Sequence, residues 1–84
     1  IKPACPVHFL VVPVKHIPNP SEIKDEEQKI FGKMFQVAGK VAKELGVGES
    51  GYRMVVNVGP DAGQEIFHLH IHILGGKKFG WPPG

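Results

Sequence analysis

The stretch that decides the fold is Phe67-His68-Leu69-His70-Ile71-His72-Ile73-Leu74-Gly75-Gly76, in which histidines alternate with large apolar residues. Strict alternation predicts a half-buried strand, because successive side chains on a strand point to opposite faces. The three imidazoles are therefore expected on one face of this strand. The side chains expected on the other face, packed against a core, are Phe67, Leu69, Ile71 and Ile73.

Three histidines on one face are typical of a chemical site. Histidine titrates near neutral pH, and its neutral ring carries one hydrogen-bond donor and one acceptor. A row of such groups beside a Gly-rich loop is less typical of an idle, solvated edge, which is the alternative interpretation.

Length and composition predict one small domain over residues 1–84. Domains of this size bury a modest core, so an oligomer is expected. The formal net charge is +2, from ten basic and eight acidic residues. This small, scattered charge argues against a nucleic-acid or membrane partner.

The cysteine count bears on the compartment. Cys5 is the only cysteine, so an intrachain disulfide is excluded and a reducing compartment, the cytoplasm, is expected. The sequence predicts no signal peptide, and it contains no apolar run of membrane-spanning length. It also lacks an initiator Met, which leaves organellar targeting open.

One long helix is predicted in the first half of the chain. It is expected to run from about Ser21 or Asp25, both capping residue types, to Leu45, with Gly46 as its C-terminal cap. Apolar residues recur along it at helical spacing and are expected in the core. They are Ile30, Phe31, Met34, Val37, Ala38, Val41, Ala42 and Leu45.

Two further strands are predicted, at 8–14 and 52–58. The Pro-rich stretch 16–20 indicates a loop, in which His16 is expected to be a surface histidine. The turn-rich loop 59–64 predicts an antiparallel hairpin between 52–58 and the histidine strand. The order strand, helix, strand, strand predicts an α+β fold with a mostly antiparallel sheet.

Metal binding is one interpretation of the histidine row. Three histidines plus water form a known catalytic zinc site. However, the Cα atoms of His68 and His72 are about 13 Å apart on a regular strand. One ion does not easily draw three rings from such a strand, so no metal ligand is predicted and a zinc protein is the weaker alternative.

Nucleophilic catalysis is the favoured interpretation. A central histidine can attack phosphorus when an acceptor holds its other ring nitrogen and fixes its tautomer. The flanking histidines can then donate to an anionic substrate, and the loop 59–65 is expected to offer free backbone N–H groups to phosphate oxygens. Phosphoryl or nucleotidyl transfer depends largely on such positioning.

These residues resemble the histidine triad (HIT) superfamily, and within it the bacterial form of the Hint branch of nucleotide-binding proteins. The run 68–74 is similar to the motif His-φ-His-φ-His-φ-φ, where φ is apolar, and 6–16, 51–57 and 74–84 extend the resemblance over essentially the whole chain. It implies a homodimer of an α+β fold with one main helix on an antiparallel sheet. It also implies hydrolysis of purine nucleoside phosphoramidates, such as adenosine 5′-monophosphoramidate, to the nucleoside monophosphate and an amine, without a cofactor.

The resemblance also implies roles for individual residues. His70 is the nucleophile and becomes transiently nucleotidylated, His72 contacts the phosphate region, and His68 and His8 orient this network. Trp81 approaches the active site of the partner subunit. The nucleotide-binding residues that it implies are Ile1, Asn57, Gly63, Gln64, Glu65, His70, His72 and Trp81.

Two features depart from the family pattern. Glu65 stands where many eukaryotic Hint proteins have a serine, which is a bacterial trait. The family also has residues before the point where this chain begins, so its HIT domain is expected to be N-terminally incomplete. A nucleotide-sensing regulatory or scaffold protein is the second functional interpretation.

Overall fold

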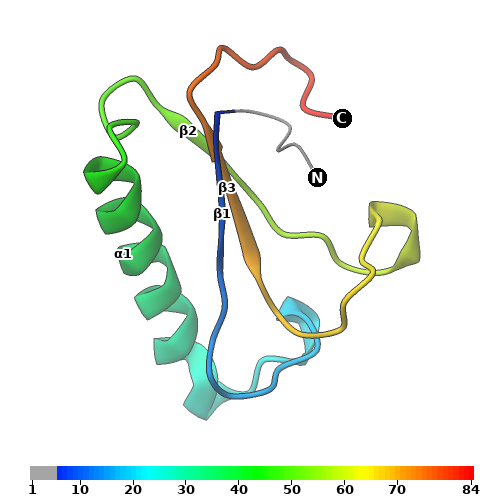
Figure 1. Cartoon of the computed structure of the whole chain (residues 1–84). Coiled ribbons are helices and arrows are strands. Elements are labelled where there is room, and N and C mark those ends of the chain that lie inside the picture. The colour runs from blue at the N-terminus through cyan, green and yellow to red at the C-terminus, as the bar shows by residue number, and fades with distance from the viewer. Residues whose placement is uncertain (1–5) are drawn as a thin grey trace.

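A three-stranded antiparallel sheet and one long helix form the architecture of residues 6–84, which the computed structural model describes. The strands are β1 (Val7–Val11), β2 (Tyr52–Val55) and β3 (Ile71–Gly75), in the order β1-β3-β2. Helix α1 (Gln28–Glu44) covers one face of the sheet (Figure 1). The predicted α+β fold is confirmed, and its central strand is the histidine strand.

The register of β3 determines which side chains share a face. His72 lies opposite Leu10 of β1 and Val55 of β2. Ile71 and Ile73, which alternate with His72, are 0% exposed. They pack with residues of α1 in a core that consists of Val11, Ile17, Met34, Ala38, Leu69, Ile71 and Ile73. The apolar face of β3 therefore packs against α1, and the face that carries His72 points away from the helix.

The hydrogen-bonded part of the histidine strand begins later than predicted. β3 starts at Ile71, so His68 and His70 precede the ladder. Leu69 keeps the alternation and is 1% exposed, but Phe67 is 59% exposed, and the prediction that it packs in the core is wrong. The Leu69 N–H donates to the Ile17 carbonyl in a loop. The chain therefore enters the sheet only at Ile71, and Phe67 lies outside the core.

Helix α1 also begins later than predicted, because two separate turns precede it. Pro20–Glu22 and Asp25–Glu27 form 3-10 turns, and the Asn19 side chain caps the first by accepting the Ser21 N–H at 3.0 Å. The early start of the helix is therefore wrong, although its apolar stripe does reach the core through Met34 and Ala38.

The end of α1 follows the prediction in part. Gly46 adopts φ 82° directly after the helix, in the left-handed region that glycine tolerates, which confirms it as the terminating residue. Its N–H donates to the Lys43 carbonyl at 3.1 Å. Leu45 is 52% exposed, so its predicted place in the core is wrong. In the described part of the chain, no helix is both long and apolar enough to cross a membrane.

The strands flanking β3 are shorter than predicted. β1 ends at Val11, two residues before Pro13, which has no N–H to continue a ladder. β2 ends at Val55, so its connection to β3 runs over 56–70 and contains a further 3-10 turn, Pro60–Ala62. The antiparallel pairing of β2 with β3 is confirmed.

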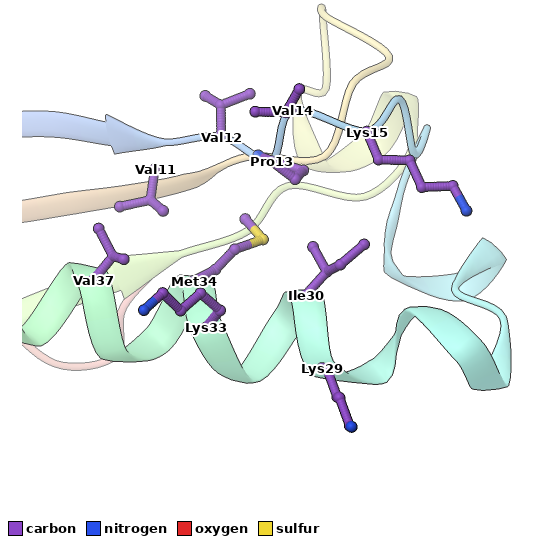
Figure 2. A pocket seen from close by; sticks show the side chains of 10 residues that line it. All are labelled: Val11, Val12, Pro13, Val14, Lys15, Lys29, Ile30, Lys33, Met34 and Val37. Carbon is purple, nitrogen blue, oxygen red and sulfur yellow. The ribbon is translucent and has the colours of Figure 1, made fainter.

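An open groove of about 460 Å³ lies between the end of β1 and α1. Figure 2 shows Ile30, Met34 and Val37 pointing from the helix toward the strand. The described residues that line the groove include no histidine: Val11, Val12, Pro13, Val14, Lys15, Lys29, Ile30, Lys33, Met34 and Val37. The groove is therefore separate from the histidine site described next.

Candidate active site

All five histidines of the chain meet in one array, although they come from three segments. His8 belongs to β1, His16 to the loop that follows β1, and His72 to β3, while His68 and His70 lie just before β3. Contacts run in the order His16, His68, His70, His72, His8. The last four are the catalytic residues that the family resemblance implies.

His70 is held by a backbone acceptor. Its Nδ1 lies 2.7 Å from the carbonyl oxygen of His68. Because a carbonyl oxygen can only accept, Nδ1 must carry the hydrogen, and in the neutral ring Nε2 then holds the lone pair. This is the tautomer that the sequence-based hypothesis requires of a nucleophile. The ring is half-buried, so the lone pair belongs to a residue that solvent and ligand can still reach.

His68 is held in the same way by another segment. Its Nε2 lies 3.1 Å from the carbonyl oxygen of Pro13, so Nε2 carries the hydrogen. The next residue, Leu69, donates its N–H to the Ile17 carbonyl. The loop after β1 therefore fixes both the side chain and the backbone of this segment, and with them the carbonyl group that His70 uses.

His72 and His8 are held by each other. Their Nδ1 and Nε2 atoms, respectively, are 3.1 Å apart, and the His72 ring also lies edge-to-face with that of His70, with centroids 4.9 Å apart. Partial burial lowers the pKa of His72 below its ordinary value of 6.5, and positive charge on His70 or His8 lowers it further. His72 is therefore neutral at neutral pH, and one of the two facing nitrogens donates to the other.

The loop before the histidine segment is tied to itself. Gln64 is buried, its amide nitrogen donates to the Pro18 carbonyl at 3.0 Å, and its amide oxygen accepts the Gly59 N–H at 2.8 Å. The backbone N–H groups of Gly63 and Gln64 donate to Pro60 and Gly59. The expectation of free backbone N–H groups is therefore wrong for Gly59, Gly63 and Gln64, because the turn uses them to close itself.

The other predicted nucleotide-binding residues lie in different segments of the chain. Asn57 is half-buried just after β2, and Glu65 is exposed next to Gln64. Trp81 is 83% exposed in the C-terminal tail. Ile1 lies outside the described residues. The role of each in binding a nucleotide stays a prediction.

Arg53 fixes the tail that carries Trp81. It lies opposite Leu74 of β3, its Nη2 donates to the Gly80 carbonyl at 2.9 Å, and its guanidinium group lies 4.9 Å from the centre of the Phe79 ring. The indole of Trp81 is thus presented to solvent by an anchored segment.

Sequence reasoning missed His16 as a neighbour of the site. It is exposed, as predicted, but its ring lies edge-to-face with that of His68, with centroids 5.0 Å apart and planes at 67°. The signal was absent from the local sequence, because only the folding of the loop onto residues 68 and 69 brings these two distant positions together.

In residues 6–84 no group of three or more His, Cys, Asp or Glu side chains is arranged to hold a metal ion. The array instead presents rings paired with carbonyl groups or with one another.

Comparison with known proteins gives the class. The family model of the HIT domain matches residues 1–79. An uncharacterized HIT-like protein of Synechocystis is 44% identical over 84 residues, which are all of this chain and 73% of that protein. The chain therefore belongs to the HIT family, as its histidine motif indicated.

Solved structures agree with this assignment. The crystal structure of a HIT family hydrolase from Legionella pneumophila superposes with a TM-score of 0.93 at 40% identity, covering 98% of this chain and 73% of that one. A hypothetical histidine triad nucleotide-binding protein from Sulfolobus tokodaii gives a TM-score of 0.68 at 35% identity, covering 89% of this chain and 50% of that one. The chain has the fold of the HIT family hydrolases.

Proposed function

We propose that this protein is a nucleoside phosphoramidase of the Hint type, which hydrolyses the P–N bond through a nucleotidyl intermediate on His70. The observation that carries the proposal is the 2.7 Å contact between His70 Nδ1 and the His68 carbonyl oxygen. It leaves Nε2 as the nucleophilic atom and provides an acceptor for the positive charge that the ring gains when Nε2 is alkylated or phosphorylated.

The first step forms one bond and breaks another at the α-phosphorus. The lone pair of His70 Nε2 attacks, the P–N bond to the amine breaks, and the amine leaves after gaining a proton. The ring of His72, whose centroid lies 4.9 Å from that of His70, holds a phosphate oxygen in this mechanism. In the tautomer whose Nδ1 accepts from His8, the neutral His72 ring has an Nε2–H to donate.

The second step returns the enzyme to its starting state. Water attacks the phosphorus, the bond from phosphorus to His70 Nε2 breaks, and one water proton is released as the monophosphate forms. The net reaction is phosphoramidate plus water giving nucleoside monophosphate plus amine. The hydrogen on His70 Nδ1 stays in place throughout both steps, because the His68 carbonyl can only accept.

A nucleotide as the substrate and a homodimer as the working form are parts of the same proposal. The similar structure from Sulfolobus tokodaii is that of a hypothetical histidine triad nucleotide-binding protein, which supports the substrate class. The exposed indole of Trp81, on a tail that Arg53 anchors, supports a contact with the active site of a second copy. Sedimentation of the protein at micromolar concentration tests the dimer directly.

The decisive experiment replaces the nucleophile. In His70→Asn and His70→Ala, turnover of adenosine 5′-monophosphoramidate should fall by at least roughly 10³-fold, while binding of AMP measured by calorimetry persists. Acid-quenched wild type should carry a nucleotidyl adduct by intact mass, and the two variants should not. Substantial phosphoramidase activity in either variant would sink the mechanism.

Binding and turnover assays of the wild type separate catalysis from a sensor or scaffold role. AMP binding with no measurable turnover by the wild type would favour a nucleotide sensor. Thermal unfolding of both variants serves as the control for folding, because His70 is half-buried and outside the apolar core.

A further inference from the structure

The loop 13–17 contacts residues 68 and 69 of the histidine segment at three points. The Pro13 carbonyl accepts from His68 Nε2 at 3.1 Å, and the Ile17 carbonyl accepts the Leu69 N–H. Between these two hydrogen bonds, the ring of His16 rests edge-to-face on the ring of His68. The loop and the segment before β3 therefore form one unit.

Both ends of this loop are rigidly placed. Pro13 and Ile17 are buried, and Ile17 is 2% exposed within the core cluster. Lys15 pairs with the buried carboxylate of Glu27 at 2.7 Å, which ties the middle of the loop to the turn before α1. His16 is thus an exposed side chain on a fixed backbone, and its ring has a defined place beside His68.

The segment that this loop contacts also orients the proposed nucleophile, His70. His70 Nδ1 donates to the backbone oxygen of His68, so a rotation or shift at His68 turns the His70 ring and moves Nε2. Misplacing a reacting atom by about 1 Å can cost about 10²-fold in rate. The orientation of the His68 ring is therefore a control on a step in which it takes no direct part.

We propose that His16 is a positioning residue for His70, which acts by packing against His68 and holding its Nε2–H on the Pro13 carbonyl. This proposal rests on the proposed function, in which His70 is the nucleophile that has to be positioned. Centroids 5.0 Å apart with planes at 67° lie in the range preferred by edge-to-face aromatic pairs. The ring of His16, and not its charge, is what the geometry uses.

Three substitutions separate this role from a merely exposed residue. His16→Ala removes the ring, His16→Phe keeps an aromatic edge at the same place, and Val14→Ala changes a fully exposed residue of the same loop that is not among the contacts of His68. Each is compared with wild type by kcat and KM for adenosine 5′-monophosphoramidate, and by the ¹⁵N resonances of the His68 ring, which require no substrate.

The expected result is specific to positioning. In His16→Ala, kcat should fall by roughly 3- to 10-fold with KM unchanged, as loss of one aromatic pair predicts. The His68 nitrogen resonances should move toward an average of the two tautomers. His16→Phe should restore both kcat and the resonances, and Val14→Ala should match wild type.

Other outcomes would overturn the proposal. A His16→Ala variant with wild-type kcat and unchanged His68 resonances removes it, and so does a His16→Phe variant as impaired as His16→Ala. If the wild type shows no phosphoramidase activity, the proposed function fails, but the His68 resonances still test the positioning role of His16. In that case, a change of the His68 resonances in His16→Ala that is reversed in His16→Phe supports positioning, and its absence refutes it.

Discussion

The histidines before β3 and those within the sheet are fixed in two different ways. His68 and His70 each donate a ring hydrogen to a backbone carbonyl, those of Pro13 and His68 respectively. His72 and His8 face each other, with ring nitrogens 3.1 Å apart. We call the first two the carbonyl-held pair and the other two the ring-held pair.

The difference lies in how firmly each tautomer is set. A carbonyl oxygen can only accept, so each ring of the carbonyl-held pair keeps one tautomer as long as its hydrogen bond is in place. In the ring-held pair either ring can donate, and the proton positions depend on the charge of both rings. A fixed tautomer suits a nucleophile, and an adjustable one suits a group that must respond to a changing phosphate.

The largest effect within this comparison is expected in the ring-held pair, at His72. His72→Ala removes the neutral N–H that we propose donates to the phosphate oxygen. The single-turnover rate constant should fall by about 10²- to 10³-fold, as for other lost donors to a developing charge. The measurement is rapid-quench kinetics with adenosine 5′-monophosphoramidate.

The control for that prediction keeps a donor at the same position. His72→Gln retains a side-chain N–H and should lose less activity than His72→Ala. An alanine variant with the rate of wild type would show that His72 does not hold the phosphate. The double variant His8→Ala/His72→Ala should be no slower than His72→Ala, because His8 acts through His72.

A smaller effect is expected in the carbonyl-held pair, at His68. His68→Ala leaves the backbone oxygen that His70 uses but removes the ring that donates to the Pro13 carbonyl. We expect kcat to fall by about 10-fold with KM unchanged, less than for a full 1 Å misplacement. Steady-state kinetics of His68→Ala and of His68→Gln, which can still donate to Pro13, make the test. A loss expressed in KM alone would contradict a role in aiming His70.

The same contrast explains what the sequence could predict. Alternation reports which side a side chain faces, so it correctly placed Leu69, Ile71 and Ile73 in the core. It does not report where backbone pairing starts, so the predicted strand begins too early and the predicted burial of Phe67 is wrong. Side-chain direction follows from local geometry, whereas the onset of pairing depends on where a distant strand ends.

The site was predictable where it depends on one strand and unpredictable where it depends on a loop. The three histidines of the motif share a segment, so their proximity followed from spacing alone. His8 was assigned by family resemblance, because no local pattern gives the register of β1 on β3. His16 reaches His68 only because Ile17, a core residue, draws the loop inward. Similarly, no local pattern predicts that the Gln64 amide bonds Gly59 of its own loop and Pro18 of the loop after β1. Its contact with a nucleotide stays a prediction.

The smallest effect is expected from His8, and it concerns pH more than rate. Burial, His70 and His8, in that order, lower the pKa of His72 below 6.5. The neutral ring therefore persists in the folded protein as pH falls through 6.5, and the acid limb of kcat that belongs to His72 lies below that value. In His8→Ala one positive neighbour is gone and His72 is more open to water. The pKa of His72 should rise toward 6.5, and the acid limb should move to higher pH, while kcat at pH 8 falls by only about 3-fold.

Stability should follow the same titration with a definite sign. Between the folded pKa of His72 and 6.5, the unfolded chain binds more protons than the folded one, so the free energy of unfolding decreases as pH falls through this window and levels off below it. Because His8→Ala raises the folded pKa, the window narrows and the variant should lose less stability than wild type on acidification from pH 7. Urea unfolding of both proteins across this range measures the difference. Equal losses in the two proteins, together with an unmoved acid limb, would mean that His8 does not control the proton on His72, and the ring-held pair would then be a packing contact only.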